Sequence, residues 1–230
     1  TTGHQVAVKI IKRSKLRDRS ELLLQREVKH HERLRHANVV RLHTWIKTPS
    51  RYYLVMEHCD RGDLLHHINA SPSRLPDAEV RSLFRQLVEG LRFCHSIGVF
   101  HRDIKLENLM LCSSSAGGGP ELKIADFGLS TLMTAGFART HCGSPLYASP
   151  ELLGAPSAEG GPVDPDAPYD PSKSDMWATG VVLYALLASE LPFDGDDMGA
   201  LVRMIVSGKP STPVPAERGE AAAQLVAQLL

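Results

Sequence analysis

The chain has 230 residues, and 43% of them are hydrophobic, so that it can form one large domain or two small ones around a core. Its 26 basic and 26 acidic residues give a formal net charge of +0 and are scattered along the chain. This pattern argues against the basic surface that nucleic-acid binding requires. The longest apolar run, Met176 to Ala188, is shorter than the ~20 residues that cross a bilayer, and it predicts a buried helix in a protein without membrane contact.

The cysteines indicate a cellular compartment. They are widely separated and form no C-x-x-C pair, which favours a reducing environment without a disulfide framework or a zinc site. The first residues lack the basic segment and apolar stretch of a secretory signal. We therefore expect a protein of the cytoplasm or the nucleus. The four cysteines are Cys59, Cys94, Cys112 and Cys142.

The first sixty residues predict a strand, a helix and two more strands. Alternation from Val6 to Ile11 predicts a strand that directs Lys9 among apolar neighbours. Ser20 can cap a helix that runs to about Leu34. Two further β-rich runs, 39–46 and 52–56, are separated by turn-forming residues.

The rest of the chain is predicted to be mainly helical. Apolar residues recur at the helical period from Asp77, and Gly98 follows as a stop signal. Two short apolar runs, 109–111 and 122–125, flank a serine- and glycine-rich loop at 113–120 and predict a hairpin. A second segment rich in helix breakers, 154–172, predicts a loop before the buried helix.

Residues 99–110, with the sequence VFHRDIKLENLM, match the kinase catalytic-loop pattern HRDLxxxN. Phosphoryl transfer needs an acceptor hydroxyl aimed in line and metal ions that neutralise charge between the phosphates. Asp103 can take or orient the hydroxyl proton, Asn108 offers a neutral oxygen to magnesium, and Lys105 supplies a cation for the transferred group. The alternative, a polar surface turn, is disfavoured by the length of the match.

A second motif, Asp126-Phe127-Gly128, follows the predicted hairpin and adds a carboxylate ligand for magnesium. It lies 18 residues after Asn108 and 23 residues before the Ser-Pro-Glu of 149–151. With these motifs in order, the chain resembles the eukaryotic protein kinase family over essentially its whole length. The resemblance implies an α+β fold of two lobes. Residues 1–57 would form part of a small lobe, mainly antiparallel strands with one helix, and 58–230 an incomplete, mainly helical large lobe.

The resemblance also implies which residues bind ATP. Lys9 matches the lysine that holds the α- and β-phosphates, and Glu27 the acid that pairs with it. Without the resemblance, they would be read as a strand-edge lysine and a solvated helix residue. Met56 matches the gatekeeper, and backbone groups of Glu57 and Cys59 would meet adenine. Ala7 and Met110 would lie on either side of the adenine ring. Asp63 would lie near the ribose and the peptide. Glu107 completes the predicted set, and together with Asp63 it would offer acidic groups to a basic peptide.

The stretch RTHCGSPLYASPE resembles the activation segment of the AMP-activated and sucrose-nonfermenting kinases, in the calcium/calmodulin-dependent group. Thr140 occupies the activating phosphosite, and its phosphate would pair with Arg102. Ser144 and Lys105 match the pair typical of serine/threonine kinases. The resemblance therefore implies a kinase that uses ATP and Mg²⁺, phosphorylates serine or threonine of protein substrates, is activated by an upstream kinase at Thr140, and works with regulatory subunits or domains.

Two departures from the family bear on the predicted site. The GxGxxGxV pattern is absent, since the chain begins at the turn before the Lys9 strand, and we expect that loop to lie upstream. His31 stands where the family places an apolar side chain of its regulatory spine. A neutral histidine can stack there, but a protonated one is costly to bury, so we expect activity to fall below neutral pH. The alternative is a half-exposed histidine without this role.

Two further expectations concern Asp175 and the choice of function. The resemblance implies that Asp175 braces the catalytic-loop backbone, although a helix N-terminal acid is the plainer alternative.

A pseudokinase-like scaffold or allosteric binding module is the alternative function. Such proteins usually lose one of four residues, and all four are present here: Lys9, Asp103, Asn108 and Asp126.

Overall fold

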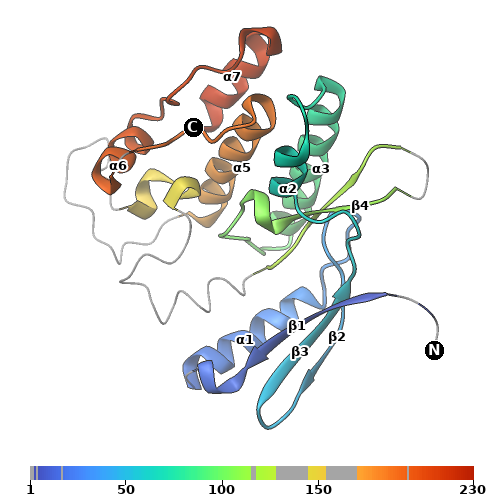
Figure 1. Cartoon of the computed structure of the whole chain (residues 1–230). Coiled ribbons are helices and arrows are strands. Elements are labelled where there is room, and N and C mark those ends of the chain that lie inside the picture. Colours follow the sequence, from blue (N-terminus) through green and yellow to red (C-terminus); the bar gives the residue numbers. More distant parts are fainter. Residues whose placement is uncertain are drawn as a thin grey trace.

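The computed structural model of the chain describes residues 3, 5–16, 18–114, 118–127, 145–153, 170–195 and 197–230, without the side chains of 18, 19 and 27. Strands gather at one end and most helices at the other (Figure 1). The strands are β1 (Val6–Lys12), β2 (Leu42–Lys47), β3 (Arg51–Glu57), β4 (Leu109–Cys112) and β5 (Glu121–Ile124). The helices are α1 (Asp18–His31), α2 (Leu64–Ala70), α3 (Asp77–Ser96), α5 (Pro171–Ala188), α6 (Met198–Ser207) and α7 (Glu220–Leu229).

The first three strands form an antiparallel sheet in the order β1-β3-β2, and α1 lies along it (Figure 1). The register places Lys9 opposite Leu54 and Ala7 opposite Met56. A small apolar core joins α1 to the sheet. Its buried members are Ile11, Leu24, Val28, Leu42, Tyr52 and Leu54. The sheet and α1 therefore hold Lys9 on a framework with a core of its own.

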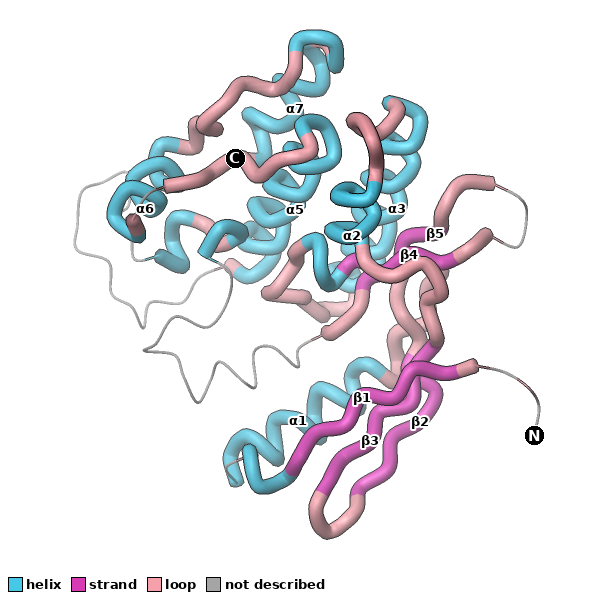
Figure 2. Tube along the Cα trace, in the orientation of Figure 1, coloured by secondary structure: helices cyan, strands magenta, loops and turns pink. Residues whose placement is uncertain are grey.

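The antiparallel β4–β5 hairpin connects this sheet to the helices (Figure 2). The amide of Val40 donates to the carbonyl of Ile124 at 2.9 Å, and the amide of Ile124 donates to the carbonyl of Asn38 at 2.9 Å. On the other side, Asp63 forms a β-bridge with Met110. The hairpin thus fixes the residues that follow β5 between the two parts of the molecule.

The helical part packs around α5, which is buried along almost its entire length. This explains the uninterrupted apolar run in the sequence, because a helix that is hydrophobic on all sides belongs in a core. Helices α3 and α7 both pack against it, and buried leucines of α3, including Leu83 and Leu87, belong to the same core. No helix in the described part of the chain has the length and apolar character needed to cross a membrane.

Several predicted elements are confirmed, namely the α+β fold, the long helix from Asp77 and the hairpin. Gly98 follows α3 with φ at +73°, a conformation that glycine adopts without steric cost. Two boundaries are wrong. The first helix begins at Asp18, not Ser20. It ends at His31 because the amides of Arg33 and Leu34 bond three residues back and tighten the chain after the helix.

The predicted loop at 154–172 is too long at its end. Helix α5 already begins at Pro171, where the carboxylate of Asp170 accepts a hydrogen bond of 2.9 Å from the amide of Ser172. Residues 154–169, and 115–117 of the other predicted loop, lie outside the described residues. The division of the lobes between 57 and 58 stays a prediction.

Candidate active site

The catalytic loop is held in place by a buried carboxylate of α5, that of Asp175. The amide of His101 donates to Asp175 Oδ2 at 2.9 Å, and the amide of Arg102 donates to Oδ1 at 2.7 Å. His95 Nε2 lies 2.8 Å from the same Oδ2. Arg102 has φ at +64°, which a non-glycine residue adopts only where its surroundings impose it. The predicted brace by Asp175 is therefore confirmed.

The three predicted residues of the catalytic loop lie together. Lys105 Nζ is 2.8 Å from Asp103 Oδ2, and Asn108 Nδ2 donates to the same oxygen at 2.8 Å. Asn108 also donates to the Asp103 carbonyl at 2.8 Å. These contacts hold the Asp103 carboxylate between a cation and an amide, so its position is set before any substrate binds.

Lys9 and Asp126 bring the small sheet to the end of β5. Lys9 Nζ is 2.8 Å from Asp126 Oδ1, and both side chains are about one third exposed, at 32% and 36%. Asp126 has φ at +60°. The predicted partner of Lys9, Glu27, lies on α1, but its side chain is outside the described residues. That pairing stays a prediction.

Phe127 is enclosed by two histidines. Its ring centroid is 4.8 Å from that of His101 and 5.8 Å from that of His31. His31 is 3% exposed, and its Nε2 lies 2.8 Å from the carbonyl oxygen of Val40. Burial lowers the pKa of His31 despite this hydrogen bond. The alternative of a half-exposed histidine is therefore wrong, and burial favours the neutral form of the ring.

The residues predicted to surround adenine lie at the start of β1, the end of β3 and the start of β4. Ala7 pairs with Met56 across the sheet, while Met110 bridges to Asp63. The Asp63 carboxylate also accepts the amide of His66 at 2.8 Å and so caps α2. The remaining three predicted positions can be placed but not tested. Glu57 ends β3, Cys59 is partly exposed after it, and Glu107 is exposed beside the catalytic loop.

The sequence analysis missed Lys123. It is 8% exposed, and its Nζ lies 2.9 Å from Glu57 Oε1 and 2.9 Å from the Ala37 carbonyl. Burial alone would lower the pKa of Lys123, but the Glu57 carboxylate and further negative groups together raise it, and the net direction is upward. The signal was available, since Lys123 is a charge within a strand of apolar residues, as Lys9 is.

Thr140 and Ser144 of the predicted activation segment lie outside the described residues. Arg102, the predicted partner of a phosphate on Thr140, is exposed. Among the described residues, no group of three or more His, Cys, Asp and Glu side chains could hold a metal ion. A metal at this site would therefore depend on fewer such protein ligands, together with amide and phosphate oxygens.

Comparison with known proteins decides the family. The model of the family described as "Protein kinase domain" matches residues 1–230. The chain belongs to the protein kinase family. The kinase domain is 40% identical over 210 residues to NUAK family SNF1-like kinase 2 of Rattus norvegicus, covering 90% of this chain and 31% of that protein. It is 39% identical over 214 residues to SNF1-related protein kinase catalytic subunit alpha KIN12 of Arabidopsis thaliana, covering 92% and 40%.

A third relative is similar over nearly the same share of the chain. The kinase domain is 38% identical over 217 residues to CBL-interacting serine/threonine-protein kinase 1 of Arabidopsis thaliana, covering 92% of this chain and 45% of that protein. The chain thus spans less than half the length of these relatives. The predicted resemblance to AMP-activated and sucrose-nonfermenting kinases is confirmed. The chain is thus a protein kinase domain, and one of these relatives is named as a serine/threonine-protein kinase.

Proposed function

We propose that the whole protein transfers the γ-phosphate of ATP to serine and threonine hydroxyls of protein substrates. The observation that carries this proposal is the catalytic loop, in which Lys105 and Asn108 each lie 2.8 Å from Asp103 Oδ2. Phosphoryl transfer depends mainly on positioning and electrostatic stabilisation, and this loop supplies both. Asp103 would orient the acceptor hydroxyl and take its proton, while Lys105 would stabilise charge on the transferred group.

Nucleotide binding is assigned to the wall opposite the catalytic loop, which is formed by the small sheet, α1 and the end of β5. Lys9 would hold the α- and β-phosphates, with Glu27 as its partner. Its contact with Asp126 supports this role because it places the ammonium group beside a proposed metal ligand. The adenine ring and ribose would be bound by Ala7, Met56, Glu57, Cys59, Asp63, Glu107 and Met110.

Mg²⁺ fits the residues at the end of β5 and in the catalytic loop. Carboxylate and amide oxygens are the ligands that this ion prefers, and Asp126 and Asn108 provide one of each. Among the described residues, both hydrogen bonds of the Asn108 side-chain amide use its nitrogen, which leaves its oxygen for a metal. Bound Mg²⁺ would neutralise charge between the phosphates.

Activation is assigned to phosphorylation of Thr140 by an upstream kinase. Arg102 supports this assignment, because its side chain is exposed while its amide is held at 2.7 Å by Asp175. A phosphothreonine that paired with this guanidinium would act on the residue next to Asp103. Ser144 would contribute to recognition of the acceptor. Since one relative is named for its interaction with CBL, we also propose that regulatory subunits or domains control the whole protein.

The cysteines support a cytoplasmic or nuclear location, because the three described ones, Cys59, Cys94 and Cys112, are free thiols.

Catalysis is tested by phosphorylation of a positional peptide library by the full-length protein, with Asp103→Ala as the control. We expect phosphate on serine and threonine peptides and a loss of about a hundredfold or more in the variant. Absence of transfer by the protein phosphorylated at Thr140 would favour the alternative of a pseudokinase-like scaffold.

A further inference from the structure

Helix α1 is joined to the sheet by little apolar packing. Among its described side chains, only Leu24, Val28 and His31 are buried. Leu23 is partly buried against the same core, and it is the sixth residue of α1. The contacts described before it in the helix, at Glu21, are polar. A polar cluster supplies the attachment there.

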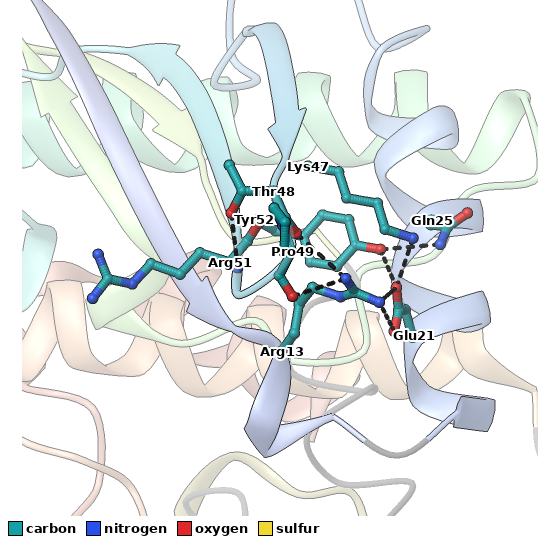
Figure 3. A network of polar contacts seen from close by, with 8 residues as sticks. All are labelled: Arg13, Glu21, Gln25, Lys47, Thr48, Pro49, Arg51 and Tyr52. Atoms are coloured by element: carbon teal, nitrogen blue, oxygen red, sulfur yellow. Dashed lines mark hydrogen bonds and ion pairs between the residues drawn. The ribbon is translucent and has the colours of Figure 1, made fainter.

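This cluster converges on the carboxylate of Glu21 (Figure 3). The hydroxyl of Tyr52 donates to Glu21 Oε1 at 2.6 Å, and Lys47 Nζ lies 2.8 Å from the same oxygen. The guanidinium of Arg13 reaches Oε1 at 3.0 Å and Oε2 at 3.2 Å. Gln25, one turn along the helix, donates to the Tyr52 hydroxyl at 3.0 Å. We call these five residues the Glu21 cluster.

The Glu21 cluster joins four parts of the small sheet and its helix. Arg13 directly follows β1, Lys47 ends β2 and Tyr52 lies in β3. Arg13 also donates to the Pro49 carbonyl at 3.0 Å, which fixes the turn between β2 and β3 (Figure 3). The strand that carries Lys9 and the helix that carries Glu27 are therefore tied to one carboxylate.

The charge balance makes this attachment depend on Glu21. Its side chain is 17% exposed and faces two cations. The Lys47 ammonium, then the Tyr52 hydroxyl and the Arg13 guanidinium, lower the pKa of Glu21 to about 2. The carboxylate is thus charged throughout the physiological range. Its replacement by an amide would leave two neighbouring cations without their shared counterion.

We infer that Glu21 is a positioning residue for phosphoryl transfer, which holds α1 and the end of β1 in the relation that lets Glu27 pair with Lys9. This inference rests on the proposed roles of Lys9 and Glu27. Glu27 follows Glu21 by six residues in one helix, about 9 Å along its axis. A helix of this length moves as one body, so a shift of its first turns moves Glu27 as well.

The test compares Glu21→Gln, Glu27→Gln and the double variant in the full-length protein phosphorylated at Thr140. Phosphorylation of a peptide is measured at varied ATP, at a temperature below the onset of unfolding of every variant. We expect Glu21→Gln to lower kcat/KM for ATP about tenfold and to leave KM for the peptide unchanged. In the Glu27→Gln background, the same change should have no further effect, because Glu21 acts through Glu27.

Glu32→Gln is the matched control, since Glu32 follows α1 and no ion pair is recorded for it among the described residues. It should leave kcat/KM unchanged. Tyr52→Phe removes one hydrogen bond to Glu21 and keeps the buried ring, so it should lower kcat/KM less than Glu21→Gln does. It takes the place of Glu21→Gln in the test if Glu21→Gln does not fold. A lower melting temperature with unchanged kcat/KM would overturn the inference, and so would losses that multiply in the double variant. A Glu27→Gln variant with full activity would instead overturn the proposed Lys9–Glu27 pair.

Discussion

The two walls of the active site are held in different ways. The catalytic loop is attached to Asp175, whose side chain is 0% exposed. Lys9 and Asp126 on the other wall pair through side chains that are 32% and 36% exposed. An ion pair in solvent contributes little to stability, whereas a buried carboxylate that loses its partners is costly. The loop to which we assign the chemistry is therefore fixed by the fold, while we expect the wall assigned to the nucleotide to adjust.

The largest effect is expected at Asp175. An amide in place of the carboxylate would turn one acceptor of the backbone amides of His101 and Arg102 into a donor. Asp175→Asn should lower the free energy of unfolding by about 3 kcal/mol and reduce phosphorylation of a peptide strongly. Thermal unfolding and turnover measure both changes.

The control for this change is Asp170→Asn at the start of α5. Asn caps a helix about as well as Asp, so stability should change by less than about 0.5 kcal/mol. If Asp175→Asn had as small an effect as this control, the loop would not be fixed from α5, and the contrast between the two walls would fail.

A smaller, pH-dependent effect is expected at His31. Its pKa is lowered in the folded protein, so below its ordinary value of 6.5 the unfolded chain takes up the proton first. Stability should then fall by up to about 1 kcal/mol per pH unit on acidification, and activity with it. In the His31→Leu variant, the acid limb of the pH–activity profile should flatten. An identical limb in both proteins would contradict this role.

The smallest change in stability is expected at Lys9. Because its contact with Asp126 is partly exposed, Lys9→Met should alter the free energy of unfolding by less than about 1 kcal/mol. Turnover should nevertheless be nearly lost, since the phosphates would lose their cation. Thermal unfolding and peptide phosphorylation, measured on the same sample, separate the two effects. A large loss of stability would mean that this wall is as rigid as the catalytic loop.

The difference between the walls also explains what could be predicted from the sequence. Asp103, Lys105 and Asn108 lie within one short motif, so their proximity follows from local chain geometry. Long-range pairs follow from packing instead. The contacts of Glu21 with Tyr52 and of Lys123 with Glu57 join residues that no sequence spacing brings together.

Local rules also failed where several residues compete for one role. Ser20 is a residue type that suits a helix cap, but α1 already begins at Asp18, two residues earlier. His31 could be exposed or buried on its helix, and only its packing against Phe127 decides between them. The apolar run of α5, by contrast, had one consistent interpretation, a buried helix, and that prediction is confirmed.

Hydrogen exchange of the full-length protein, measured by mass spectrometry with and without an ATP analogue and Mg²⁺, tests the contrast between the two walls most directly. The amides of His101 and Arg102 donate to a buried carboxylate, so peptides covering them should be protected in both states. Peptides from α1 should exchange faster without nucleotide and gain protection when it binds. Rapid exchange in the catalytic loop of the nucleotide-free protein, or equal protection of α1 in both states, would contradict the proposed difference between the walls.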